Sequence, residues 1–509
     1  MTRYAASSFS AKDSPTFISK MKLLSAIQIR EWDEYTIEHE PILSIDLMEK
    51  AAGTCYDTII DYIAGKKIKI FCAKGNNGGD GLALARMLLQ DGNDVTVYIL
   101  EFGAPGTKDF QINLSRLHAI TTNIHFIQSE DFFPELNKDD LVVDALFGSG
   151  LNRPLDGVTA QLVNHINNSG AFIISIDLPS GMFTDKSSKG NAIIKANITI
   201  TFQCLKLCFI VAENAAYFGE LKITDIGLHP DFLQTVSCTS QTVEADFIQQ
   251  IFKPRNAFAH KGSFGHALII AGSEGKTGAC LLAARACLRA GSGLLTVAPF
   301  VDNLSLNVST PEAMTASMDT AIASIHNFSS VGIGPGIDIS EDILTEVLSH
   351  YKKPMVIDAG AFAGLAQINN WQQLLPEGSI LTPHPKEFDR LFGASENDFE
   401  RMDKALKISS ENKFILVLKG HHTLIAKEGK GWFNTTGNAG LAKGGSGDML
   451  TGIITSLLAQ GYEPLHAAMI GVYWHGLTAD VVAETKPMEV MLASDCIEAM
   501  GDALNMIAT

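Results

Sequence analysis

The sequence has little positive charge and no long apolar run. Its 509 residues include 39 Lys and Arg but 56 Asp and Glu, which gives a formal net charge of −17. This balance argues against nucleic acid or an anionic membrane as the main partner. No apolar run is long enough to span a bilayer, so we expect no membrane partner. A phosphorylated small ligand is still allowed, because a helix N-terminus can bind phosphate inside an acidic protein.

The sequence also lacks a cysteine framework. Its 8 cysteines include no CxxC pair, and no cluster of His and Cys has the spacing of a zinc site. We therefore expect free thiols in a cytoplasmic protein. Residues 1–20 are rich in Ser and lack the hydrophobic region of a secretory signal, so we expect a disordered extension there.

Short internal repeats and low-complexity tracts are absent as well. What the chain does contain is an alternation of apolar runs and helical stretches, in two halves. A polar, uneven stretch separates the halves and predicts a linker. The expected extension, first domain, linker and second domain have the bounds 1–20, 21–228, 229–245 and 246–509.

Strand-like runs that alternate with helical stretches predict an α/β fold with a doubly wound parallel sheet. In the first half the expected strands are 66–73, 95–100, 141–146, 172–178 and 198–202. In the second half they are 267–271, 294–298, 331–334, 354–358, 379–381 and 414–419. Ligands of such sheets bind beyond the carboxyl ends of the strands, so the segments that follow these runs are candidate sites.

A glycine-rich segment lies near the end of the second half. Residues 440–452 read GLAKGGSGDMLTG, and apolar residues with helical spacing follow Asp448. The segment predicts a glycine loop that leads into a helix N-terminus, where backbone N–H groups and the helix dipole can bind a phosphate. A carboxylate beside a bound phosphate is suited to handling a proton. The simpler alternative is a helix that Asp448 caps after a flexible loop.

Three strand ends of the first half carry glycines and polar side chains, although neither a GxGxxG motif nor a Walker A motif is present. These segments are GNNGGDG at 75–81, DALFGSGLNRP at 144–154 and DLPSG at 177–181. Oxygen-only side chains suit a hard cation, and Arg153 with loop N–H groups suits phosphate. Each segment has a simpler interpretation, as a tight turn, a buried strand-end carboxylate or a turn cap.

The segments KGNNGGDG, VVDALFGSGLNRPL and IDLPSG resemble the epimerase domain of the NAD(P)H-hydrate repair family, over about residues 23–228. The resemblance implies a Rossmann-like domain that epimerises hydrated NADH and NADPH, with Asp177 as the acid/base. It implies a potassium ion held by Asn77, Asp144 and Ser180. Lys206 matches a lysine of the family, with a surface lysine as the alternative. The implied substrate contacts are Asn76, Asn77, Gly78, Gly79, Asp80, Gly148, Ser149, Gly150, Leu151, Asn152, Arg153, Pro154 and Asp177.

The second half is similar to the dehydratase domain of the same family, over about residues 247–508. The segments that carry this resemblance are KGSFGHALIIAGS, GIGPG, IDAGA, LTPHPKEF, LKGHHT and NAGLAKGGSGDMLTG. It implies a ribokinase-like fold and dehydration of the S hydrate with ADP and Mg²⁺, although the loop spacing does not distinguish ADP from ATP. Asp448 would be catalytic, and Ala267, Gly336 and His384 would line the hydrate pocket with it. The implied nucleotide contacts are Lys419, Gly420, His421, His422, Thr423 and Gly447.

Both resemblances together imply a bifunctional repair enzyme whose partners are the NADH and NADPH hydrates (NADHX and NADPHX) and ADP. We also expect a homo-oligomer. A second hypothesis is a kinase of a small hydroxymethyl heterocycle, fused to a ligand-binding domain, because such kinases share the glycine–Asp loop. A third makes the first half a binding or dimerisation module without catalysis.

Overall fold

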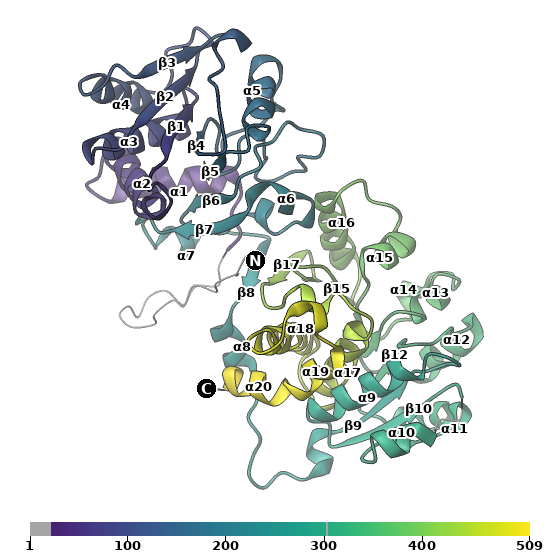
Figure 1. Cartoon of the computed structure of the whole chain (residues 1–509). Coiled ribbons are helices and arrows are strands. Elements are labelled where there is room, and N and C mark those ends of the chain that lie inside the picture. Colours follow the sequence, from purple (N-terminus) through teal and green to yellow (C-terminus); the bar gives the residue numbers. More distant parts are fainter. Residues whose placement is uncertain (1–21, 302–303, 509) are drawn as a thin grey trace. The chain divides into compact units, whose positions relative to one another are not determined.

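The computed structural model describes residues 22–301 and 304–508 (Figure 1). The extension expected at 1–20 lies outside the described residues. The chain divides into two compact units, with the boundary between Cys238 and Thr239. Among the described residues, no helix combines the length and apolar composition needed to cross a membrane.

The first unit is built on a seven-stranded parallel sheet with the order β3-β2-β1-β4-β5-β6-β7. The strand order reverses between β1 and β4, which is where a doubly wound sheet opens a ligand crevice. The strands are β1 (Lys67–Cys72), β2 (Val95–Leu100), β3 (Ile124–Ile127), β4 (Asp140–Ala145), β5 (Phe172–Ile176), β6 (Ile198–Phe202) and β7 (Glu220–Thr224). The helices are α1 (Ala26–His39), α2 (Ser44–Ile59), α3 (Asn76–Gln90), α4 (Lys108–His118), α5 (Gly157–Asn167), α6 (Ala215–Phe218) and α7 (Phe232–Thr235).

Apolar side chains cover both faces of this sheet. Ile70 of β1 packs with residues of α2, α3 and α4, whereas the next residue, Phe71, packs with residues of α5 on the other face (Figure 1). Successive side chains of a strand point to opposite faces, so helices on both sides bury a nearly continuous apolar strand. A ligand can therefore bind at the carboxyl edge of the sheet and not on its covered faces.

The segment GNNGGDG differs from the loop that its glycines predict. Gly75 is the N-cap of α3, and the rest of the segment forms the first turns of this helix, which begins at Asn76 shortly after β1 ends at Cys72. A Cβ at Gly78 would lie 1.6 Å from the Ala73 carbonyl oxygen, and one at Gly81 would lie 2.6 Å from the Ala145 Cβ. The glycines therefore let the helix start pack directly on the strand ends.

The second unit contains a ten-stranded sheet with the order β11-β10-β9-β12-β13-β14-β15-β16-β17-β8. From β11 to β15 in this order, neighbouring strands are parallel. β16 runs antiparallel to both β15 and β17, which the sequence did not predict. The strands are β8 (Ser240–Val243), β9 (His266–Ile270), β10 (Leu294–Ala298), β11 (Met314–Thr315), β12 (Ser330–Ile333), β13 (Met355–Ile357), β14 (Ile380–Leu381), β15 (Ile415–Leu418), β16 (Leu424–Lys427) and β17 (Lys430–Asn434).

Two apolar helices, α17 and α18, form the centre of this unit. Most of their residues are buried, and the two helices belong to one apolar cluster with β13, β14 and β15. A Cβ at Gly452 of α17 would lie 2.2 Å from the Ala283 carbonyl oxygen, so α17 also packs closely on α9. The helices are α8 (Ala245–Ile251), α9 (Thr277–Arg289), α10 (Leu304–Ser309), α11 (Met318–Ala323), α12 (Glu341–His350), α13 (Ala361–Leu365), α14 (Trp371–Leu374), α15 (Pro385–Phe392), α16 (Asp398–Glu411), α17 (Ser446–Ala459), α18 (Pro464–Ala483), α19 (Ala493–Glu498) and α20 (Met500–Ala508).

The segment predicted as a linker, 229–245, contains regular structure. It includes α7 and β8, and β8 pairs in parallel with β17 at the edge of the second sheet. Its polar composition, SQTV in the strand, suits an edge strand as well as a linker, so composition alone did not separate the two.

Candidate active sites

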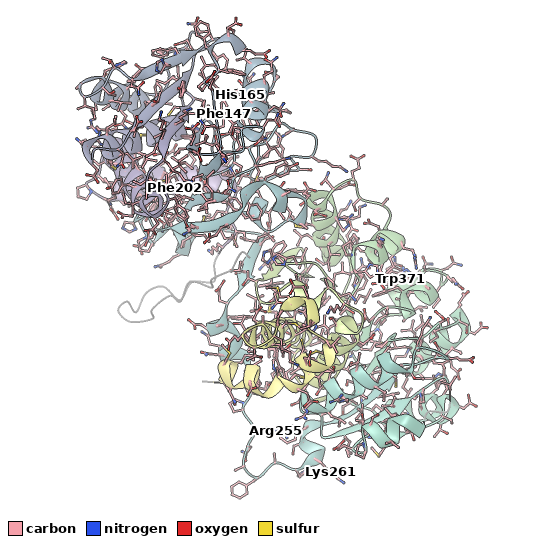
Figure 2. All side chains as sticks on the ribbon, viewed as in Figure 1. Phe147, His165, Phe202, Arg255, Lys261 and Trp371 are labelled. Carbon is pink, nitrogen blue, oxygen red and sulfur yellow. The ribbon has the colours of Figure 1, made fainter. Side chains whose placement is uncertain are left out.

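One buried carboxylate ties the ends of β4 and β5 together. Asp144 in β4 is fully buried, and it accepts hydrogen bonds from Ser175 Oγ (2.8 Å), the Ser180 N–H (2.8 Å) and Ser180 Oγ (2.5 Å). Burial raises the pKa of Asp144, and the hydrogen bonds from Ser180 and Ser175 oppose that rise. Ser180 Oγ also accepts the N–H of Phe147 (2.8 Å), which is labelled in Figure 2. Asp144 and Ser180, two predicted cation ligands, are thus in direct contact.

The loop after β4 passes between two further predicted site residues, Asn77 and Asp177. A Cβ at Gly148 would lie 2.5 Å from Asp177 Oδ2 and 3.2 Å from Asn77 Oδ1, so only a glycine leaves room for both side chains. The amide oxygen and nitrogen of Asn77 are both buried, and neither has a hydrogen-bond partner among the described residues. A buried amide without a partner is costly, which makes Asn77 a candidate ligand-binding group.

Two partners contact the carboxyl group of Asp177. This residue follows β5 with a φ of 65°, which is unusual for a residue other than glycine. Its oxygens accept the N–H of Ser149 (2.7 Å) and form an ion pair with Lys206 Nζ (3.0 Å). Burial acts to lower the pKa of Lys206, but the charge of Asp177 and further groups outweigh it, so the pKa is raised and Lys206 stays charged. Lys206 is fully buried, which rules out the surface lysine considered from the sequence.

The remaining predicted substrate contacts differ in exposure. Asn76 is exposed at the start of α3, whereas Gly78, Gly79 and Asp80 are buried in the turns that follow. The half-buried or exposed residues after β4 are Gly148, Ser149, Gly150, Leu151, Asn152, Arg153 and Pro154.

Two more carboxyl groups share the electrostatic environment of Asp177. Burial raises the pKa of Asp80 well above its ordinary value, and the charges of Asp177 and Asp33 raise it further. Burial also raises the pKa of Asp33, on α1, to about 7, with the charge of Asp177 as the next cause. The motifs at the strand ends did not include Asp33.

In the second unit, Asp448 lies in the first turn of α17. The helix begins at Ser446, after Gly445, which has a φ of 97°. First-turn N–H groups have no partner within the helix, and the helix dipole adds partial positive charge there. Burial raises the pKa of Asp448 to about 6, the charge of Asp358 raises it further, and Lys419 lowers it. A carboxyl that titrates near neutrality can act as an acid or a base.

An ion pair lies beside Asp448. Asp358, directly after β13, is almost fully buried and accepts hydrogen bonds from Lys419 Nζ (2.8 Å) and Thr451 Oγ1 (2.8 Å). A Cβ at Gly447 would lie 3.3 Å from Lys419 Nζ and 3.6 Å from Asp358 Oδ2. The predicted nucleotide contacts Lys419 and Gly447 therefore meet at the start of α17.

The predicted hydrate-pocket residues are placed differently from one another. The Gly336 carbonyl accepts the N–H (2.8 Å) and the Oγ (2.9 Å) of Ser273, which joins the loops after β9 and β12. Ala267 does not lie at this edge, because it is the second residue of β9 and fully buried in an apolar cluster. The alanine that lies near Gly336 is Ala279 of α9. A Cβ added at Gly336 would lie 2.8 Å from the Cβ of Ala279.

His384 caps the helix that follows β14. Its Nδ1 accepts the N–H groups of Lys386 (3.1 Å) and Glu387 (3.3 Å), and Glu387 accepts the N–H of His384 (2.9 Å). The side chain is exposed at the carboxyl edge of the sheet. Capping thus fixes the orientation of the ring.

The other predicted nucleotide contacts form the turn between β15 and β16. Thr423 Oγ1 donates to the Gly420 carbonyl (3.3 Å), and the rings of His421 and His422 lie 4.4 Å apart. Burial, with a smaller contribution from His421, lowers the pKa of His422 to about 4, so this ring is neutral at physiological pH. The turn therefore offers the neutral ring of His422 and backbone groups to a ligand.

Comparisons with known proteins match both units. A family model described as "YjeF-related protein N-terminus" matches residues 44–208, and one described as "NAD(P)H-hydrate dehydratase" matches residues 267–501. A protein of Moorella thermoacetica named bifunctional NAD(P)H-hydrate repair enzyme Nnr is 34% identical over 506 residues, covering 94% of this chain and 96% of that protein. The chain belongs to the bifunctional NAD(P)H-hydrate repair family.

Two further proteins are similar to this chain. The Escherichia coli K12 protein of that name is 34% identical over 445 residues, 86% of this chain and 84% of its own length. The structure of the ADP/ATP-dependent NAD(P)H-hydrate dehydratase from Bacillus subtilis, co-crystallised with ATP and Mg²⁺, is 31% identical and covers 52% of this chain and 98% of its own, with a TM-score of 0.48. Both resemblances stated from the sequence, and the α/β fold class, are confirmed for this family member.

Sequence reasoning missed several residues of the two candidate sites. Asp358 ends a predicted strand in the segment IDAGA, a candidate site position, but sequence reasoning assigned it no role. The buried Nε2 of His475, on α18, has no hydrogen-bond partner among the described residues. Burial lowers its pKa to about 4, while a hydrogen bond with the backbone of Ser446 opposes that shift. No local pattern links α18 to the start of α17, so this contact depends on tertiary packing.

Proposed function

We propose that this chain repairs hydrated NADH and NADPH in two steps. The first unit interconverts the R and S hydrates, and the second unit dehydrates the S hydrate with ADP and Mg²⁺. The observation that carries the proposal is a proton-transferring carboxyl at the carboxyl edge of each sheet. Asp177 is paired with Lys206, and Asp448 has a pKa of about 6 at a helix N-terminus. The division into two catalytic domains, the cytoplasmic location and the homo-oligomeric state are part of the proposal.

In the epimerase unit, Asp177 acts on the hydroxyl at C6 of the reduced ring. Protonation of the hydroxyl oxygen lets it leave as water, while the lone pair of the ring nitrogen forms a C=N bond. Water then adds to the other face and loses a proton. The cationic intermediate lies near buried carboxylates, which stabilise positive charge in a site of low dielectric constant. Lys206 and the Ser149 N–H fix the orientation of Asp177.

Potassium fits the residues of this unit. Asn77 has a buried amide oxygen without a partner, and Asp144 is a buried carboxylate with no Lys or Arg partner among the described residues. Such oxygens suit a hard cation. Asn77, Asp144 and Ser180 would hold the ion, which would supply positive charge beside the bound nucleotide. The contact between Phe147 and Ser180 couples these ligands to the loop that carries Gly148.

In the dehydratase unit, ionised Asp448 removes the proton of the C6 hydroxyl, and the oxygen attacks the terminal phosphoryl group of ADP. The bond between that phosphorus and the bridging oxygen breaks, and AMP leaves. First-turn N–H groups of α17 and Lys419 stabilise the charge of the transferred group. Phosphate then leaves with the electron pair of the C–O bond, assisted by the ring nitrogen, and loss of a proton from the adjacent ring carbon gives the reduced nucleotide. Mg²⁺ would enter with the nucleotide and offset phosphate charge.

The test is recovery of reduced nucleotide from purified R and S hydrates by the full chain with ADP, Mg²⁺ and K⁺, followed by absorbance. Asp448→Ala should lower recovery from both hydrates by about 10²–10⁴-fold. Asp177→Ala should abolish recovery from the R hydrate only, so each variant serves as the folding control for the other. The proposal fails if the wild-type chain recovers nothing, and a stable phosphorylated alcohol as product would favour the kinase hypothesis.

A further inference from the structure

The dehydratase step proposed above, on which the following inference rests, needs two parts of the second unit in register. One is the turn at residues 419–423, which would bind the nucleotide and is called the nucleotide turn below. The other is the glycine loop before α17, the helix that carries Asp448. An error of about 1 Å between reacting groups can lower a rate about 10²-fold. The two parts lie on different segments of the chain, so further contacts must hold the glycine loop in place.

The glycine loop is short, and a helix bounds it at each end. The 3₁₀ helix η7 (Ala439–Leu441) ends directly before it, and α17 begins at Ser446. Only residues 442–445 lie between the two helices. At the second end, Gly445 packs on α9, because a Cβ there would lie 2.5 Å from Leu282 Cδ1. The position of η7 therefore sets the path of the loop and the direction of the first N–H groups of α17.

One carboxyl group, that of Asp480 on α18, holds the start of η7. Its Oδ2 accepts the N–H of Gly437 (2.7 Å), and its Oδ1 accepts a hydrogen bond from Asn438 Nδ2 (3.0 Å). Asn438 is the N-cap of η7, and its Oδ1 accepts the N–H of Gly440 (3.0 Å). A carboxylate accepts from two donors at once, whereas a side-chain amide has one acceptor and one donor group. Asp480 therefore matches the two donors that meet it.

The segment that Asp480 holds packs directly on α18. Gly437 has a φ of 103°, which glycine adopts readily, and a Cβ at Gly437 would lie 3.2 Å from the Gly476 Cα. A Cβ at Gly476 would lie 2.4 Å from Thr436 Oγ1, and this hydroxyl donates to the Tyr473 carbonyl (2.9 Å). Gly476 and Tyr473 lie about one and two turns before Asp480 on the same helix. Close backbone packing therefore brings the two donors within reach of Asp480.

Asn434, at the end of β17, connects the same segment to the nucleotide turn. Its N–H donates to the Thr423 carbonyl (2.9 Å), and its carbonyl accepts a hydrogen bond from His422 Nδ1 (3.3 Å). Its buried side chain donates to the Thr436 carbonyl (2.9 Å) and accepts from Thr436 Oγ1 (3.1 Å). Hydrogen bonds thus lead from the nucleotide turn to the residue before Gly437, where the contacts of Asp480 begin.

We propose that Asp480 is a positioning residue of the dehydratase. Through Gly437 and Asn438 it holds the glycine loop in register with the nucleotide turn. The N–H groups at the start of α17 then point at the phosphoryl group while Asp448 meets the C6 hydroxyl. Asp480 acts through the loop and not on the reacting atoms. Its loss should therefore lower the rate of the bound complex far more than the affinity for ADP.

The test measures ADP-dependent dehydration of the S hydrate by the full chain, together with equilibrium binding of ADP. Asp480→Asn keeps the size of the side chain but sets an NH₂ group against one of the two donors. We expect kcat to fall about 10²-fold, while KM and the dissociation constant for ADP stay near their wild-type values. Glu484→Gln is the matched control, because Glu484 is the exposed acid one turn further along, at the end of α18, and it should change neither kcat nor KM.

A reciprocal exchange tests the hydrogen bonds themselves. Asn438→Asp alone sets two carboxyl groups against each other, so it should also lower kcat. Combined with Asp480→Asn, it restores every donor–acceptor pair. The amide at position 480 accepts the Gly437 N–H and donates to the carboxylate at position 438, which still accepts the Gly440 N–H. The double variant should therefore be about tenfold faster than either single variant.

The outcomes separate positioning from a structural role. The proposal is overturned if Asp480→Asn loses ADP binding in parallel with kcat, if it loses no activity, or if the double variant is no faster than the single ones. Epimerisation of the R hydrate in the same preparations reports on the first unit and should be unchanged. Wild-type chain that recovers no reduced nucleotide from the S hydrate would instead refute the dehydratase function itself.

Discussion

Each unit of this protein buries an Asp–Lys pair at the carboxyl edge of its sheet, and the two pairs have different effects. In the first unit, Lys206 holds Asp177, the residue proposed to transfer the proton, at 3.0 Å. In the second unit, Lys419 holds Asp358 at 2.8 Å, and the proposed base is the neighbouring Asp448. The first pair therefore contains the proposed proton-transferring residue itself, whereas the second acts on a third group, Asp448, whose pKa is about 6.

The pairs also differ in what surrounds the lysine. The Lys206 side chain is 0% exposed, whereas that of Lys419 is 21% exposed. Asp358 keeps a hydrogen bond from Thr451 if its lysine is removed, and Asp177 keeps only the Ser149 N–H. Loss of the lysine should therefore affect stability and catalysis together more strongly in the first unit than in the second.

The largest effects on stability are expected when each lysine is removed. We expect Lys206→Met to destabilise the first unit by about 3–5 kcal/mol, because it leaves a buried carboxylate unpaired. Lys419→Met should cost the second unit about 1.5–3 kcal/mol, since water reaches this pair and Thr451 remains. Hydrogen exchange measured by mass spectrometry on peptides from β6 and β15 reports the two units separately. Equal losses in both units would show that burial does not distinguish the pairs.

The rate of dehydration should depend on pH, because Asp448 must be ionised to accept a proton. The wild-type rate should therefore rise with pH to a plateau, with a midpoint near about pH 6. Asp358→Asn removes a negative charge that raises this pKa, so the midpoint should move down. Lys419→Met removes a positive charge that lowers it, so the midpoint should move up. Profiles of kcat/KM for the S hydrate test this, and a shift of both midpoints in one direction would contradict it.

A smaller effect is expected from the unpartnered amide of Asn77. Asn77→Leu should remove the dependence of epimerisation on potassium and leave the ADP-dependent dehydration of the S hydrate unchanged. A titration with KCl against tetramethylammonium chloride at equal ionic strength measures this dependence. If the variant responds to potassium as the wild-type chain does, Asn77 is not a ligand of the ion.

The sequence predicted those parts of the sites that lie at strand ends. Asp144, Asp177 and Ser180 follow apolar runs, and the carboxyl ends of parallel strands meet at one edge, so spacing along the chain indicates neighbourhood in space. Asp33 and His475 lie on helices, whose position over the sheet depends on packing. The helical start of α3 was missed because its glycines are typical of turns as well as of close helix–strand contact.

The pairing of β8 with β17 bears on how the two activities can be separated. A fragment that starts at residue 246, the domain start expected from the sequence, would lack the outermost strand of the second sheet. The backbone groups of β17 that face β8 would then be open to strands of other molecules, which favours aggregation. A fragment of the dehydratase half that begins at Thr239 keeps this edge covered, so the cut that frees a stable second enzyme lies several residues before the one that composition suggests.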